Sequence, residues 1–451
     1  MGHRRGCPQG EGPGAEGGSQ GLRHRRHPLP HRRGPRLTAP RTTTIGSYPV
    51  FPSGEDLEYY QKMSASGVGD EVLDPYDWAT QEAVSDFAAA GVEVVSTGQT
   101  RGDLYSLFLD PRFVKGIEWQ GAEAYVTGRL ERVASSRLGD LKLARSMLPR
   151  HLSLKEPVTD AYTLARFAKV MTGSYRDTRD LATDINQKVV IPEIEDLQKG
   201  GADAVQLDSP NLAAESSVPS YIPDLYEEAA KAAKVPLALH ACGDTARIFR
   251  FLAGLKVRTL ELDFYHHPRL LDEVARTGFD QEIGLGVLDG QVLRVEPVSE
   301  ISALIEKARK KIGEDRLGYV HPHCGQRSID RDTAFRKNAN MTMARDDVFF
   351  GEAEEPDGAR LRGKQADAKG YFLLTVNRES RELVATFYTY RHRALRRYRS
   401  RSAERLMQAL DSEADSLGIS RRHLAYLALE LGRAEGSLEE RSPPYRQRVT
   451  Q

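Results

Sequence analysis

Three side chains in this sequence could together bind one metal ion. His240 and Cys242 are separated by a single alanine at the end of the apolar run VPLALHACGD, and Cys324 ends a second run, LGYVHPHCG. Residues i and i+2 of a β-strand point to the same face, so His240 and Cys242 can face a common ligand. One imidazole and two thiolates suit zinc, with an open coordination position if the site is catalytic.

A further ligand could come from a third run that lies between these two in the sequence. The run VRTLELDF ends with Glu261 and Asp263, which would also share a strand face. Either carboxylate could bind the metal, and we favour Glu261. A single histidine or cysteine at such a position is more often an ordinary buried residue. The joint placement of these residues at three predicted strand ends instead favours a metal site.

The elements that would position these residues form a regular alternation of strand-like and helix-like segments. Such alternation is typical of βα units around a parallel sheet, and eight strands can close a TIM (β/α)8 barrel, which we place at residues 41–350. Amphipathic segments such as residues 180–201, which end in a glycine pair, are predicted helices. The predicted strands are Thr42–Ser47, Val92–Thr97, Ser153–Thr159, Ala204–Asp208, Leu237–Cys242, Thr259–Phe264, Ile283–Asp289 and Gly318–His321, and segments near Leu130 and Leu141 compete for the third place.

Polar groups at other predicted strand ends could bind a small amino acid. The first strand ends in Ile45, Gly46 and Ser47, the second leads to Gln99, and the fourth ends at Asp208. A carboxylate leaving a buried strand could hold an ammonium group, and donors near Ser47 could hold a carboxylate. A metal ion lowers the pKa of a thiol, so the combination predicts a zwitterionic thiol as substrate.

The first 40 residues differ in composition from the rest of the chain. The whole sequence has 64 basic and 64 acidic residues, whereas residues 1–41 hold nine arginines against Glu11 and Glu16. This tail is rich in Gly, Pro, Arg and His, so we expect residues 1–40 to be disordered. A nucleic-acid arm or an organellar transit peptide is one interpretation. We favour a nonessential extension or a start codon placed too far upstream, and expect no nucleic-acid partner.

The number of cysteines and the hydropathy of the sequence indicate the cellular compartment. Three cysteines, one of them Cys7 in the tail, cannot build a disulfide framework. No apolar run approaches the roughly 18 to 20 residues that span a bilayer, and the N-terminus lacks the hydrophobic segment of a secretory signal. We therefore expect a cytoplasmic protein without a membrane partner. No dinucleotide or phosphate-loop signature is evident.

A smaller α+β domain is expected after the barrel. Residues near 346–364 turn acidic and glycine-rich, and we place a linker at 351–368 and the domain at 369–451. A β-hairpin is predicted over Gly370–His392 around the polar NRESRE segment, followed by helices in 402–418 and 421–438. The basic run from Arg391 to Arg405 is interpreted as a solvated helix start, or alternatively as a contact for an acidic partner.

From about Thr42 to Arg345 the chain resembles the cobalamin-independent methionine synthases, specifically the short archaeal type without the duplicated N-terminal barrel. The stretches that carry the resemblance are TTTIGSYP, TGQTRGDLYSLF, LKEPVTDAYTLA, GADAVQLDSPNL, LHACGD, TLELDF, GLGVLDG and HPHCGQR. The resemblance implies a zinc-dependent methyltransferase that methylates the thiol of homocysteine to form methionine. It implies zinc ligands at His240, Cys242, Glu261 and Cys324, and homocysteine contacts from Ile45, Ser47, Gln99 and Asp208.

Three positions bear on how far that resemblance extends. Ser209 stands where the family usually has the glutamate of Asp-Glu-Pro. Gln99 stands where the two-barrel enzymes have a glutamate, although the short type resembles this chain there. After strand seven, where the two-barrel enzymes carry a histidine proton donor, the sequence runs Asp289, Gly290, Gln291. A folate leaving group needs a proton, whereas a corrinoid leaving group does not. The methyl donor is therefore either a methylcorrinoid, brought by a corrinoid protein, or a methylated folate or pterin.

Two other functions stay open. The barrel and metal could serve a different small thiol such as coenzyme M, or the barrel could be a non-catalytic, zinc-stabilised binding subunit. The last segment, with GYFLLTVNRE and HLAYLALELGRAEGSLEERSPPYRQ, resembles a small uncharacterised domain family found on pterin-related and methyl-transfer proteins. That resemblance implies either a docking module for a methyl-carrying partner or a cap on the barrel.

Overall fold

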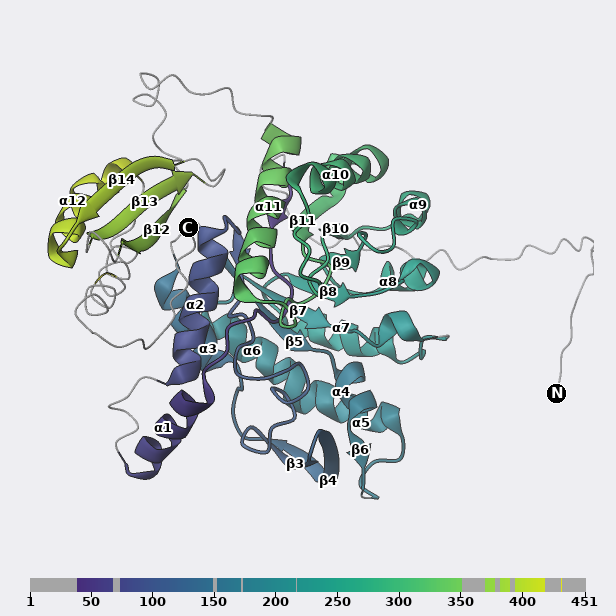
Figure 1. Ribbon diagram of the computed structural model, residues 1–451. Helices are drawn as coiled ribbons and strands as arrows, with labels where there is room; N and C mark the ends of the chain where they lie inside the picture. The colour runs from purple at the N-terminus through teal and green to yellow at the C-terminus, as the bar shows by residue number, and fades with distance from the viewer. Residues whose placement is uncertain are drawn as a thin grey trace, which may run out of the picture. The chain divides into compact units, whose positions relative to one another are not determined.

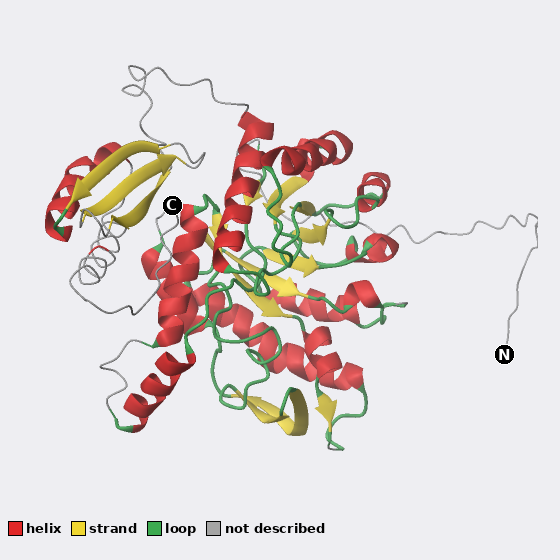
Figure 2. Cartoon of the chain, viewed as in Figure 1, coloured by secondary structure: helices red, strands yellow, loops and turns green. Residues whose placement is uncertain are grey.

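Eight parallel strands form the centre of the protein, surrounded by helices (Figures 1 and 2). The computed structural model describes residues 39–67, 74–148, 152–171, 173–215, 217–350, 370–377, 382–389, 394–417 and 431. The strands lie in the spatial order β1-β11-β10-β9-β8-β7-β5-β2. Their bounds are Arg41–Thr42 (β1), Val94–Val95 (β2), Ser153–Thr159 (β5), Ala204–Asp208 (β7), Leu237–Ala241 (β8), Thr259–Asp263 (β9), Glu282–Gly286 (β10) and Leu317–His321 (β11).

The two edge strands of this sheet meet and bring it to closure. Thr43 and Val94 form a parallel bridge, and the Thr43 hydroxyl donates to the Val94 carbonyl at 2.8 Å. The predicted TIM barrel is thereby confirmed, including Ser153–Thr159 as its third strand. Strands β1 and β2 are shorter than predicted, and the segments that follow them turn at Gly46 (φ +53°) and Gly98 (φ +77°).

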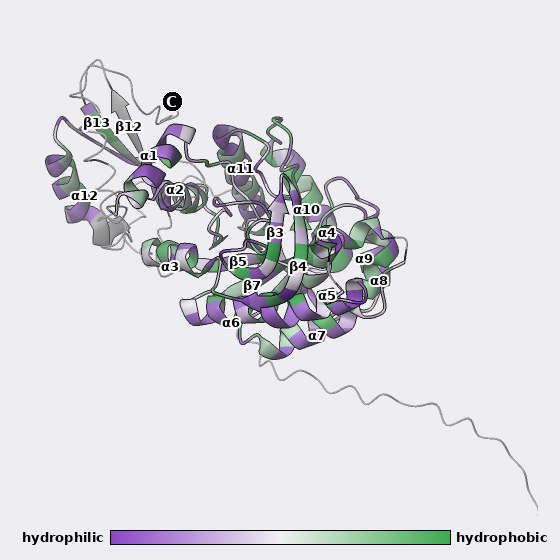
Figure 3. Cartoon of the chain, turned by 90° about the horizontal axis from the view of Figure 1, so that it is seen from below, coloured by the Kyte–Doolittle hydropathy of each residue, from purple (hydrophilic) through white to green (hydrophobic). Residues whose placement is uncertain are grey.

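Several of the helices around the barrel are amphipathic and bury one face. In α7 (Ile222–Ala232) the buried residues Ile222, Leu225, Tyr226 and Ala229 recur at intervals of three and four. Figure 3 shows hydrophilic and hydrophobic residues alternating along α7 and its neighbour α6. The other helices of this part are α1 (Gly54–Ala65), α2 (Pro75–Ala89), α3 (Leu138–Met147), α4 (Ala161–Phe167), α5 (Thr178–Ile185), α6 (Ile191–Gly200), α8 (Phe249–Leu252), α9 (Leu270–Arg276), α10 (Val298–Ile312) and α11 (Arg331–Phe350).

The helix predicted over residues 180–201 is present but changes pitch along its length. Between α5 and α6, residues Asn186–Val190 form a π-helical turn. Pro192 has no backbone N–H to give to the carbonyl four residues earlier, which accounts for the widened turn that precedes it. The helix ends as predicted, with Gly201 in the left-handed conformation (φ +104°).

The region that offered rival third strands forms separate structure. Strands β3 (Val114–Gln120) and β4 (Glu123–Arg132) make an antiparallel hairpin, which β6 (Lys169–Val170) extends. Leu130 lies in this hairpin and Leu141 lies in α3, so neither belongs to the barrel sheet. Helix α11 runs to Phe350, which corrects the expectation that linker composition begins near residue 346. The proposed linker at 351–368 lies outside the described residues.

The small C-terminal sheet has one more strand than the sequence indicated. Strands β12 (Gly370–Asn377) and β13 (Glu382–Thr389) form the predicted hairpin, and β14 (Ala394–Ser400) pairs antiparallel with β13. The basic run is therefore largely a strand and not a helix start; Arg396, Arg397 and Arg399 are exposed on it.

Helix α12 (Ala403–Leu417) follows as predicted. It buries Leu406 and Leu410, and β13 buries Leu383 and Ala385. The second predicted helix, at 421–438, lies outside the described residues except for Leu431. None of the described helices has the combined length and apolar character needed to cross a bilayer.

Candidate metal centre at the carboxyl end of the barrel

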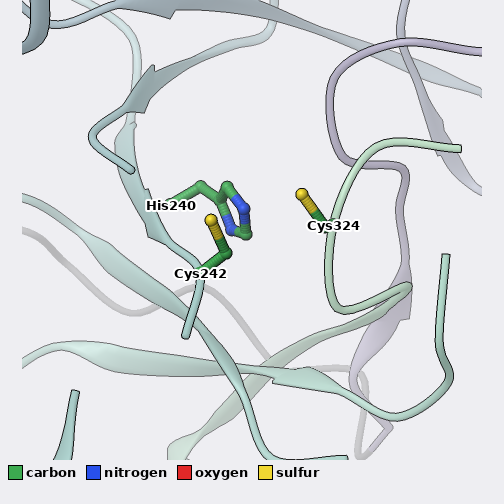
Figure 4. A group of neighbouring side chains, drawn as sticks. All are labelled: His240, Cys242 and Cys324. Atoms are coloured by element: carbon green, nitrogen blue, oxygen red, sulfur yellow. The ribbon is translucent and has the colours of Figure 1, made fainter. Parts of the chain in front are cut away.

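The structure brings His240, Cys242 and Cys324 together at the carboxyl ends of two strands. His240 lies in β8, Cys242 directly follows β8, and Cys324 lies in the loop after β11. The Nδ1 or Nε2 of His240 and the two sulfur atoms all lie within 4.8 Å of one another. Figure 4 shows the Cys324 sulfur facing the His240 ring from the opposite segment of chain. This convergence follows from the period-two geometry of β8 and from the closure of the sheet.

The sulfur and nitrogen atoms of this group lie close enough to shift one another's pKa values. Hydrogen bonding to Cys324 lowers the pKa of the Cys242 thiol, although burial opposes that shift. The same contact, together with burial, raises the pKa of Cys324. Burial alone would lower the pKa of His240, but the nearby Cys324 side chain and the carboxylates of Asp208 and Glu261 raise it overall. A divalent cation could take the place of the protons on these atoms.

Two buried polar atoms beside this group have no hydrogen-bond partner. They are Nε2 of His240 and Oε2 of Glu261, which come from residues paired across β8 and β9. Unpartnered buried polar atoms cost free energy unless a ligand satisfies them. The donor set and these two atoms therefore fit a zinc ion, which prefers nitrogen and sulfur ligands and accepts a carboxylate.

Glu261 is set apart from the other three predicted ligands by a partner that the sequence reasoning missed. It is fully buried, and its Oε1 forms an ion pair with Nζ of Lys155, which lies in β5. Burial lowers the pKa of Lys155, against the effect of the Glu261 charge. Alternation in the strand LKEPVT could have indicated an inward-pointing Lys155. The sequence gives no sign of its partner, because the pairing spans the barrel interior.

Asp208 ends β7 beside His240, its partner in the strand register. Its carboxylate accepts a hydrogen bond from Nε2 of Gln206 at 2.6 Å, and burial raises its pKa to about 6. The next residue, Ser209, turns away from this group: its hydroxyl donates to Asp160 at 2.7 Å, and Asp160 also accepts from Tyr226 at 2.8 Å. Ser209 thus anchors the chain that follows Asp208.

The first-strand residues and Gln99 lie against one another and against the Cys324 loop. A Cβ atom built on Gly46 would lie 3.1 Å from Oε1 of Gln99, and one built on Gly325 would lie 2.9 Å from Oγ of Ser47. The amide of Gln326 donates to the Ser47 carbonyl at 2.7 Å. Ile45 is buried in the same segment.

Gln99 itself is strained. It is buried and has a positive φ of 46°, the only non-glycine residue of the described chain with that feature, and its Nε2 has no hydrogen-bond partner. Non-glycine residues held in the left-handed region cluster at functional sites, where the surrounding structure offsets their cost.

A second group of metal-binding side chains lies beside the first. Asp263, His266 and His323 each offer a ligand atom, and these atoms also lie within 4.8 Å of one another. Asp263 was considered above as an alternative ligand to Glu261, but the structure places it in this second group. The paired histidines of YHHP and HPHCG were the available signal for His266 and His323.

The fold and the first group of side chains define a class: a TIM-barrel protein with a candidate imidazole and thiolate centre at the carboxyl end of its strands. The family described as "Cobalamin-independent synthase, Catalytic domain" matches residues 40–346, and PterinBD-DUF4346 matches residues 366–448. The chain therefore belongs to the cobalamin-independent synthase family, and it is an enzyme of the methyltransferase class.

Two relatives named methionine synthase agree with that assignment, and one solved structure shares the fold. The methionine synthase of Methanothermobacter thermautotrophicus is 30% identical over 313 residues, which cover 67% of this chain and 98% of the relative. That of Methanocaldococcus jannaschii is 30% identical over 323 residues, covering 67% and 97%. The B12-independent methionine synthase from Shewanella sp. W3-18-1, solved with selenomethionine, shares the fold with a TM-score of 0.57 at 19% identity, covering 69% of this chain and 98% of that one.

Proposed function

We propose that the protein transfers a methyl group to the thiol of homocysteine, forming methionine, with zinc held by His240, Cys242, Cys324 and Glu261. The observation that carries the proposal is the convergence of one imidazole and two sulfur atoms within 4.8 Å at the carboxyl end of the barrel. Catalytic residues of TIM barrels lie at this end, and zinc prefers this donor set. Bound there, zinc would lower the pKa of a substrate thiol and make it nucleophilic at neutral pH.

The residues around the centre suit an amino acid more than another small thiol. The carboxylate of Asp208 is buried beside His240, where a substrate ammonium group would form an ion pair with it. Gly46 and Ser47, with Ile45 and Gln99, would line the carboxylate end of the substrate and hold it in line for attack on the methyl group. Coenzyme M would bring a sulfonate towards a buried carboxylate, so we place it second.

The methyl donor has two candidates, a methylated folate or pterin and a methylcorrinoid. The match to PterinBD-DUF4346 in the C-terminal region supports a methylated folate or pterin, whereas a methylcorrinoid needs no proton for its leaving group. The two matched stretches also support a division into a barrel at 41–350, a linker at 351–368 and a small domain at 369–451.

The test is to purify the full chain, measure its metal content, and titrate homocysteine and coenzyme M by calorimetry. We expect about one thiophilic metal ion at the sulfur group and binding of homocysteine. A third ligand, 4-mercaptobutanoate, is homocysteine without the amino group, and we expect it to bind roughly 10- to 100-fold more weakly, the effect of one charged hydrogen bond of about 1.5 to 3 kcal/mol. Binding of coenzyme M alone would exclude homocysteine as the substrate.

Catalysis is tested separately from binding. Methionine formation is followed by mass spectrometry with methylcobalamin and, in a second reaction, with a methylated folate. Product with either donor supports a transferase and identifies the donor class. Tight binding of homocysteine with no product from either donor would instead support a non-catalytic binding subunit.

A further inference from the structure

The second group of side chains, Asp263, His266 and His323, is joined by a fourth residue, Asp289, and the four come from three neighbouring strand ends. Asp263 ends β9, His266 lies in the loop after β9, Asp289 follows β10, and His323 follows β11. Strands β9, β10 and β11 are consecutive in the sheet, so these residues meet at the same edge as the candidate zinc centre. Nothing in the proposed methyl transfer uses them.

The contacts within this group join every member to another. Nδ1 of His266 lies 3.0 Å from Asp263 Oδ2, and its Nε2 lies 3.0 Å from Asp289 Oδ2. Nδ1 of His323 accepts from the Gly290 amide at 3.0 Å and lies 3.5 Å from Asp289 Oδ1. The two imidazole rings cross edge to face with centroids 4.5 Å apart. Ligand atoms of Asp263, His266 and His323 thus lie within 4.8 Å of one another, and the Asp289 carboxylate contacts both imidazoles.

We propose that Asp263, His266, Asp289 and His323 form a second cation site, which takes a divalent first-row transition metal ion such as Mn²⁺, Fe²⁺, Co²⁺ or Zn²⁺. Two imidazoles with carboxylate oxygens are a ligand set for such ions, and the set has no sulfur to restrict it to soft metals. With neutral imidazoles the two carboxylates carry two negative charges, which a divalent ion neutralises.

The burial of these residues suits a bound ion with an accessible side. The Asp263 and His323 side chains are only 3% and 9% exposed, whereas the His266 side chain is 37% exposed. The buried members are rigidly placed by strand ends, and His266 lies where an ion could arrive and depart. His323 and Cys324 are adjacent in the chain, so the loop after β11 would contribute one ligand to each of the two sites.

The competing explanation is that no ion binds and His266 is an imidazolium held between two carboxylates. Cobalt titration of the full-length chain separates these cases, because Co²⁺ bound by thiolate gives an intense near-ultraviolet charge-transfer absorption, whereas Co²⁺ bound by nitrogen and oxygen gives only weak bands. We expect the parent protein to bind a second equivalent that adds no thiolate band. A single equivalent, all of it thiolate-bound, would overturn the proposal.

Variants assign the second equivalent to its residues. His266→Ala and Asp289→Asn should each lose that equivalent and retain the thiolate band, and His267→Ala, which removes the next imidazole in the same turn, should retain both. Two variants are used because Asp289 also accepts from the Gln291 amide, so its replacement could loosen that loop. Full cobalt binding by His266→Ala and Asp289→Asn, or loss of the thiolate band in both, would refute a separate site.

A further variant distinguishes failure of the second cation site from failure of the proposed zinc-dependent function, on which this inference does not depend. Cys242→Ser should remove the thiolate band and leave the weak bands of the second site. Histidines of the N-terminal tail could bind cobalt adventitiously, but they are common to all variants and cancel in each difference.

Discussion

The Nδ1 nitrogen of His240 donates a hydrogen bond to the backbone carbonyl of Glu261, 3.1 Å away on the neighbouring strand. A carbonyl can only accept, so this contact places a proton on Nδ1 and leaves Nε2 as the atom that can bind a metal. That Nε2 is buried without a hydrogen-bond partner. Strand pairing therefore fixes both the tautomer and the orientation of the ring before any ion binds.

Replacing one sulfur ligand should abolish both metal binding and methyl transfer. For Cys324→Ser we expect zinc content to fall towards zero and the rate of homocysteine methylation to drop by about 100-fold or more, because the substrate thiol loses its activating ion. Metal analysis and a product assay measure these effects. The matched control is Cys7→Ser, which removes the cysteine of the tail. An active, zinc-containing Cys324→Ser protein would contradict any zinc mechanism.

Removing Lys155 should destabilise the protein when metal has been removed with chelator. Lys155→Met leaves the Glu261 carboxylate buried without its ion-pair partner, a change that costs about 3 to 5 kcal/mol. The double variant Lys155→Met, Glu261→Gln should recover most of that loss, because no buried charge is left. Chemical denaturation measures both differences. In the zinc-loaded protein the loss should be smaller, since the metal then compensates Glu261; equal losses with and without zinc would argue against Glu261 as a ligand.

The buried carboxylate of Asp208 should make the chelator-treated protein less stable as pH rises. Its pKa is raised to about 6, against about 3.9 in the unfolded chain, so the folded state retains a proton that the unfolded state has lost between those values. The stabilisation is complete below about pH 4 and is lost as pH rises through about 6. Relative to Asp208→Asn, the parent should lose up to about 3 kcal/mol between pH 4 and pH 7. A pH-independent difference in thermal unfolding would show that Asp208 is not so perturbed.

The strained backbone at Gln99 should be separable from the role of its side chain. Gln99→Gly and Gln99→Ala both remove the side chain, but only glycine relieves the positive φ of 46°. We expect the glycine variant to be about 1 kcal/mol more stable than the alanine variant, because only alanine would carry the cost of the left-handed conformation. Both variants should bind homocysteine more weakly than the parent protein. Equal stability of the glycine and alanine variants would show that the backbone at Gln99 is not strained.

Most of the barrel could be predicted from sequence because its strands are short, mostly apolar runs that alternate with helix-like segments. All eight were located, and the errors lie where local conformation overrides composition. Strand β1 already ends at Thr42, before the turn at Gly46, and Pro192 widens one helix into a π turn. Strand β14 was missed because its repeated arginines resemble a solvated segment, although they lie in a strand that pairs antiparallel with β13.

The first group of side chains could be anticipated because a single strand presents His240 and Cys242 on one face. The rest depends on which strand ends meet in space, which spacing along the chain does not encode. Lys155 meets Glu261 across the interior, although the two are 106 residues apart in sequence. The gathering of His266 and Asp289 likewise requires the loops after β9 and β10 to turn towards each other.

Gly325 lies so close to Ser47 that a Cβ atom there would be 2.9 Å from the serine oxygen. The loop that carries Cys324 and the segment proposed to hold the substrate carboxylate are therefore packed as one piece, and a larger residue at position 325 would displace both. Adaptation of this barrel to a different thiol must therefore start away from this contact, for example at Asp208, since any change where the two segments meet would disturb metal and amino acid recognition simultaneously.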